Sequence, residues 1–125
     1  MTDGAADYGE YGARMESTPR LKAEIWVKGL IRRCEVEGVT AMVVRRGDAT
    51  SGTVLVKVNT LNGEAQVYGP TRDGEGALVW MSAGGAKPEP EADAYIEKQR
   101  KFDPDLWVVE IEDRAGRHFL QEPVT

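Results

Sequence analysis

The sequence has no apolar run approaching the roughly 18 residues that a membrane-spanning helix needs, which excludes a transmembrane protein. It has one cysteine, Cys34, which excludes an internal disulfide and a zinc site built from cysteines. Its one histidine, His118, excludes most zinc chemistry. The first residues include Asp3 and Asp7 and form no apolar run, so we expect no secretory signal and a cytoplasmic location.

The 125 residues are enough for one domain and too few for two. Residues 1–18 have few aliphatic side chains and an excess of acidic ones. Such a segment cannot bury enough apolar surface to offset the entropy lost on ordering. We therefore expect a disordered acidic tail at 1–18 and a single α+β domain at 19–125.

The charge is unevenly distributed along the chain, although the net charge is -5. Residues 20–46 hold seven basic and three acidic side chains, whereas residues 86–125 hold ten acidic and six basic ones. Mixed charge of this kind is common on the surface of soluble domains, and it also fits a bipolar surface that attracts a charged partner. The acidic total argues against nucleic acid as a partner, and we expect no membrane partner.

Hydrophobic spacing indicates the secondary structure of the first two-thirds of the chain. Apolar residues recur at three- and four-residue intervals from Ala23 to Cys34, which predicts an amphipathic helix over 24–37 with Cys34 buried in its stripe. Strands are predicted where β-branched residues cluster or alternate. The short loops between them predict an antiparallel meander of four strands, at 39–46, 53–59, 64–68 and 77–82.

A second helix is predicted over 91–102, after a Gly/Pro linker at 83–91. A strong strand follows at 106–112, and a short sixth strand is predicted around 118–120. Trp80 is the one tryptophan whose position allows exposure. The predicted fold class is α+β, with a mainly antiparallel sheet of five to six strands and two helices packed on one face.

Acidic residues around the fifth strand form the first candidate site. Asp105, Glu110 and Glu112 resemble the carboxylates that hold Mg²⁺ in nucleases, with Lys57 from a neighbouring strand and Asp48 as another acid. Glu112 stands where the lysine of that nuclease pattern would be. A solvated outer strand face explains the same residues, and we expect no bound metal and no cofactor.

The loop after the first strand forms a second candidate site, for phosphate or carboxylate. Its glycines, hydroxyls and arginines resemble groups that bind anions, and the candidates are Arg45, Arg46, Asp48 and Ser51. A hairpin loop whose polar side chains bind turn amides is the alternative interpretation. Arg32 and Arg33 would join Arg45 and Arg46 in one basic patch if the helix packs beside the first strand, and a solvated helix face is the alternative there.

Several stretches together resemble one family. They are residues 30–33 (LIRR), 45–48 (RRGD), 52–56 (GTVLV) and 102–110 (FDPDLWVVE). The chain is similar over 20–123 to the bacterial proteins known as domain of unknown function family 1491. The resemblance implies a bacterial, cytoplasmic single domain and carries no activity and no assigned site residues.

The absence of a catalytic triad, dinucleotide fingerprint or haem motif favours a non-enzymatic interaction module over an enzyme. We expect a protein partner or a homodimer, because a small sheet with free edges readily pairs with another strand. The alternatives are a Mg²⁺-dependent nuclease or phosphodiesterase, and phosphate or nucleic-acid binding through the arginine patch.

Overall fold

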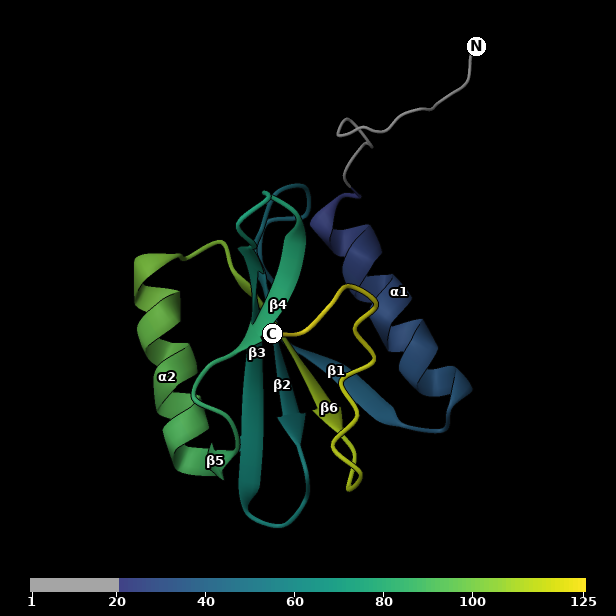
Figure 1. Cartoon of the computed structure of the whole chain (residues 1–125). Helices are drawn as coiled ribbons and strands as arrows, with labels where there is room; N and C mark the ends of the chain where they lie inside the picture. Colours follow the sequence, from purple (N-terminus) through teal and green to yellow (C-terminus); the bar gives the residue numbers. More distant parts are fainter. Residues whose placement is uncertain (1–20) are drawn as a thin grey trace.

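A sheet with one helix on each side forms the domain (Figure 1). The computed structural model describes residues 21–125, so the predicted tail at 1–18 lies outside the described residues. The elements in chain order are α1 (Ala23–Val36), β1 (Thr40–Arg45), β2 (Val54–Asn59), β3 (Glu64–Arg72), β4 (Leu78–Ser82), β5 (Lys87–Pro88), α2 (Glu89–Phe102) and β6 (Trp107–Glu112). The α+β class is confirmed, with two helices and a mostly antiparallel sheet of six strands.

The strand order is β1-β6-β2-β3-β4, and the short β5 pairs with β3. The predicted meander is therefore interrupted, because β6 lies between β1 and β2 and pairs with β2 in parallel. The physical reason is that β6 has buried apolar residues on both faces, with Trp107, Val109 and Ile111 in one cluster and Val108 in the other. A central position, with a strand on each side, removes these residues from water.

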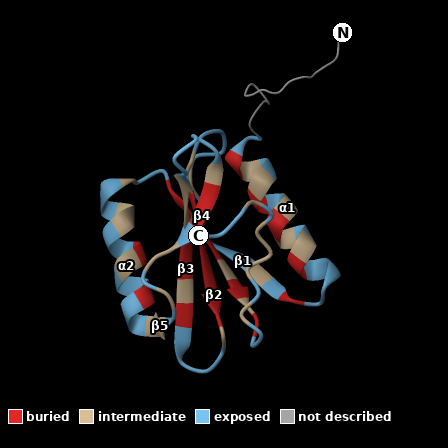
Figure 2. Ribbon diagram, in the orientation of Figure 1, coloured by how far each residue is buried: buried red, intermediate tan, exposed pale blue. Residues whose placement is uncertain are grey.

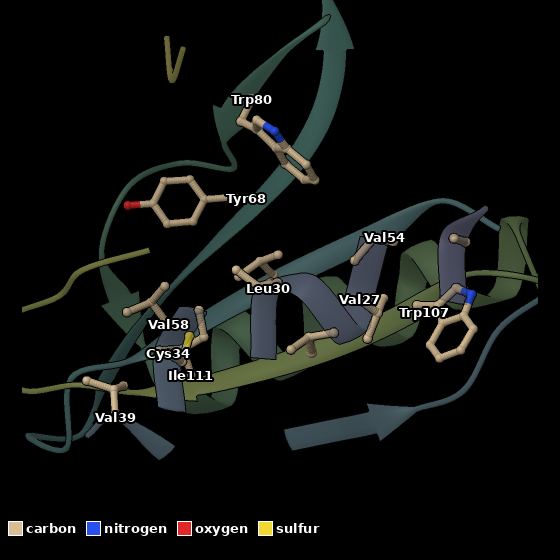
Figure 3. Close-up of a cluster of buried hydrophobic side chains, with 13 residues drawn as sticks. Val27, Leu30, Cys34, Val39, Val54, Val58, Tyr68, Trp80, Trp107 and Ile111 are labelled. Carbon is tan, nitrogen blue, oxygen red and sulfur yellow. The ribbon is translucent and has the colours of Figure 1, made fainter. Parts of the chain in front are cut away.

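The two helices lie on opposite faces of the sheet, so the prediction that both pack on one face is wrong. Val56 of β2 belongs to a buried cluster with Leu30 of α1, and the adjacent Leu55 belongs to another with Ala92 and Ile96 of α2. Figure 2 accordingly shows buried residues in the strands between the helices, including all of β2. Figure 3 shows the α1 cluster, in which Cys34 is buried as predicted. All six residues of β2 are buried, because a helix covers each of its two faces.

The chain after β6 forms no strand at 118–120, where one was predicted. Phe119 has a φ of 58°, which is outside the extended region. The chain instead continues to the edge of β4, where the Trp80 amide donates to the Pro123 carbonyl and the Thr125 amide donates to the Trp80 carbonyl. Trp80 is buried rather than exposed, because its ring stacks on Trp26 with ring centroids 5.2 Å apart.

The predicted linker at 83–91 holds β5 and the first turn of α2, which begins two residues earlier than expected. Neither helix in the described part of the chain has the length and apolar character needed to cross a membrane.

Candidate functional site

A groove of about 810 Å³ opens on the face of the sheet that carries α2. Its floor includes Val108 of β6 and Lys57 of β2, one wall is α2, and Val44 and Arg45 of β1 form the opposite side. The groove exists because α2 packs over β2 and β3 and leaves the side chains of β1 on this face uncovered.

A buried lysine organises the polar end of the groove. The Lys57 ammonium is 2.7 Å from Glu89, 2.7 Å from Asp93 and 3.5 Å from Glu110. The Asn59 amide donates to Glu89 and Glu110 at 3.2 and 3.1 Å. Lys57 is only 4% exposed, so these contacts replace the water that an ammonium group requires.

The surroundings of Lys57 have opposing effects on its pKa. Burial acts to lower the pKa, but hydrogen bonds to Asp93 and Glu89 and the charge of Glu110 outweigh burial and raise it. Lys57 is thus a permanent cation across the physiological range, and the carboxylates around it neutralise it. Residues 21–125 contain no group of three His, Cys, Asp or Glu side chains arranged to hold a metal ion. The carboxylates of Glu89, Asp93 and Glu110 form ion pairs with the Lys57 ammonium.

A β-bulge shapes the other side of the groove. Val43 is paired with Val109, and Arg45 is paired with Val108, so Val44 is an extra residue in β1. A bulge interrupts the strict alternation of side chains. It brings the adjacent Val44 and Arg45 to the groove together.

β1 is also an edge strand with apolar side chains open to solvent. Met42, Val43 and Val44 are 40%, 40% and 56% exposed, although they are consecutive. β1 has β6 on one side and no strand on the other within residues 21–125. At the opposite edge of the sheet, β4 is covered in part by residues 123–125. The apolar edge of β1 is therefore the most open surface of the sheet.

The predicted anion loop is closed by its own hydrogen bonds. The Asp48 carboxylate accepts from the Thr50 amide and from the amide and hydroxyl of Ser51, and these bonds lower the pKa of Asp48. Trp107 Nε1 donates to the Asp48 carbonyl at 2.7 Å. A side chain at Gly47 would collide with the Asp105 carbonyl. These contacts match a loop whose polar side chains bind its own amides, but the loop is not a hairpin, because β6 lies between β1 and β2.

The four candidate arginines do not share one contact. Arg33 donates to the Phe119 carbonyl at 3.1 Å, and Arg45 donates to the Pro104 carbonyl at 3.0 Å. Arg46 pairs with Glu24 of α1 and lies over the ring of Trp107. Arg32 is exposed on α1.

The three candidate acidic residues have different surroundings. Glu110 faces Lys57, and its side chain is only 15% exposed, so it does not lie on a solvated outer face. Asp105 lies in the exposed turn before β6, five residues from Glu110 along an extended segment of about 16 Å. Glu112 is paired with Thr40 at the far end of β1 and has no ion-pair partner within residues 21–125.

Sequence reasoning missed the partners of Lys57 and the exposed run in β1. The signal for the first was a lysine inside an otherwise apolar strand, because such a residue needs carboxylates from another element. Glu89 and Asp93 occupy successive turns of α2 and supply them. No local signal in the sequence indicated that Met42 and Val44 are exposed, because apolar strand residues covered by a helix have the same pattern.

Three comparisons relate the chain to known proteins. The family model described as "Protein of unknown function (DUF1491)" matches residues 21–121. A crystal structure of a DUF1491 family protein from Caulobacter crescentus CB15 is 50% identical with a TM-score of 0.79, over 85% of this chain and 100% of that chain. A solution structure of a protein from A. tumefaciens is 31% identical with a TM-score of 0.70, over 86% and 98%.

A search of curated proteins finds no match. The family match covers most of the chain, and the solved relatives share both its sequence and its fold. The chain therefore belongs to the DUF1491 family of proteins of unknown function.

Proposed function

We propose that this protein is a non-enzymatic interaction module that binds a protein partner at the edge strand β1. The observation that carries the proposal is the run of three exposed apolar residues, Met42 to Val44, on a strand with a free edge. An unpaired strand edge offers backbone donors and acceptors to an added strand, and exposed apolar side chains add hydrophobic contact.

The groove beside β1 supports binding rather than catalysis. Lys57 pairs with three carboxylates, which neutralise its charge. Asp48 is held by turn amides, and Glu110 is held by Lys57 and Asn59. Three of the groups proposed for a Mg²⁺-dependent nuclease, Lys57, Asp48 and Glu110, thus already have partners within the fold, and Asp105 lies far from Glu110 along the chain. The separation of the four arginines likewise gives no support to a phosphate-binding patch.

A site-specific photo-crosslinking experiment tests the proposal. A photoreactive amino acid replaces Met42 in the full chain, and irradiation is carried out in the source cells. The matched control carries the same group at Glu75, which is exposed in the turn between β3 and β4. We expect a discrete crosslinked product from Met42 and none from Glu75.

A second variant tests whether the product depends on the surface of β1. Val44→Lys introduces a charge beside the crosslinker, and we expect it to remove the product while leaving the circular dichroism spectrum unchanged. Equal crosslinking from positions 42 and 75, or no product from position 42, would refute the proposed function.

A further inference from the structure

We propose that the partner at β1 is a second copy of this chain, joined by antiparallel pairing of the two β1 strands into one continuous sheet. This inference rests on the proposed function and names its partner. A two-fold dimer requires a surface that is complementary to itself. The shape, the apolar residues and the charges of β1 meet that requirement.

The regular part of β1 fits a two-fold axis. The bulge at Val44 confines regular pairing to Thr40–Val43 and nearby residues. A register centred on Met42 or on Val43 places opposing side chains on the same face, as antiparallel pairing requires. Either register brings the exposed apolar residues of the two copies against each other and removes them from water.

The charges at the two ends of β1 are opposite. Arg45 lies at the end of the strand, on the groove face, and its nearest hydrogen-bond partner is a backbone carbonyl. Thr40 begins the strand and is paired with Glu112 of β6. Neither Arg45 nor Glu112 forms an ion pair within the described chain.

Antiparallel pairing brings the basic end of one copy to the acidic end of the other. Arg45 of one copy then approaches Glu112 of the second copy, and the two-fold axis repeats this contact. Glu110 and Glu112 lie on the same face of β6, and Glu110 lines the groove that Arg45 also lines. Opposite charges that are unpaired within one chain thus become paired between chains. This pairing favours a second copy in the antiparallel arrangement over a different partner.

Sedimentation of the purified full chain across the micromolar range tests the proposal. We expect a monomer–dimer equilibrium. Arg45→Glu and Glu112→Arg should each raise the dissociation constant about tenfold or more, because each places like charges together twice. The double variant restores both contacts with reversed polarity, so its dissociation constant should return close to that of the wild type.

A matched pair of methionine variants tests the apolar contact. Met42→Lys places a charge at the dimer edge, and Met81→Lys places one on β4 at a residue that is exposed to a similar degree. We expect Met42→Lys to give a monomer and Met81→Lys to dimerise normally. Backbone amides of β1 should also exchange with deuterium more slowly as the protein concentration rises, which requires no variant.

The outcomes distinguish this inference from the proposed function. A monomer throughout the micromolar range, an effect shared by both methionine variants, or no recovery in the double variant would overturn the homodimer. If the chain is monomeric but position 42 crosslinks to a different protein in cells, the interaction module stands and the second copy is refuted. If the chain is monomeric and no crosslink forms, both proposals fail.

Discussion

Replacing Lys57 with methionine should destabilise the fold strongly at neutral pH. The variant keeps most of the side-chain volume, so the loss comes from charge rather than from a cavity. Removing one partner of a buried ion pair typically costs about 3–5 kcal/mol in unfolding free energy. Here Glu89 and Asp93 are partly exposed and can turn to water, whereas Glu110 is mostly buried. We therefore expect a loss at the lower end, about 3 kcal/mol.

The pH dependence identifies the cause of this loss. Without the ammonium, the remaining carboxylates repel one another, and protonation relieves the repulsion. The difference in unfolding free energy between wild type and Lys57→Met should therefore shrink as the pH falls from about 7 to about 4.5. In the wild type the raised pKa of Lys57 means that its contribution is complete at neutral pH and is lost only as the pH rises into the strongly alkaline range.

Urea unfolding followed by tryptophan fluorescence at both pH values measures these differences. Lys98→Met on the exposed surface of α2 is the matched control, and its effect should stay within about 0.5 kcal/mol. A loss below about 1 kcal/mol for Lys57→Met at pH 7, or an equal loss at pH 4.5, would refute the argument that a buried charge cluster carries this stability.

Three further perturbations test the fold. Leu30→Ala should cost about 2–5 kcal/mol in urea unfolding, because Leu30 of α1 is fully buried between the helix and the sheet. A loss below about 1 kcal/mol would contradict this packing. Gly47→Ala should cost about 1–3 kcal/mol, because the added methyl group would collide with the backbone at Asp105. Gly74→Ala is the control and should cost at most about 0.5 kcal/mol, because the space around Gly74 is open. Equal melting temperatures for the two variants would contradict this reasoning. Hydrogen bonds from Arg117 lower the pKa of Asp113 to about 2. The wild type should therefore be more stable than Asp113→Asn above about pH 4, and it should lose that advantage as the pH falls towards about 2. Acid titration followed by circular dichroism measures this difference.

Local pattern was sufficient to locate most elements. The alternation of Val54, Val56 and Val58 correctly assigned one face of β2, and the helical stripe correctly placed Cys34 in the core. These features depend on residues within one or two turns of each other. Local periodicity therefore captures them.

Strand order and the groove could not be predicted in the same way. The insertion of β6 between β1 and β2 is a contact between distant segments, and only the unbroken apolar run at 106–109 hinted at a central position. The partners of Lys57 depend on how α2 crosses β2. The bulge at Val44 changes the face of a single residue within a run of strong strand formers, and no turn residue marks it.

The position of β6 also has a consequence for how the protein is made. During synthesis β1 and β2 leave the ribosome well before the strand that joins them, because β6 is the last strand in the order of the chain. Until residue 112 has emerged, the nascent chain exposes two apolar strand edges that have no correct neighbour. The sheet should therefore fold late and as a unit, with a slow rate set by distant contacts. Ribosome-bound chains that stop before β6 should be protease-sensitive and should bind chaperones.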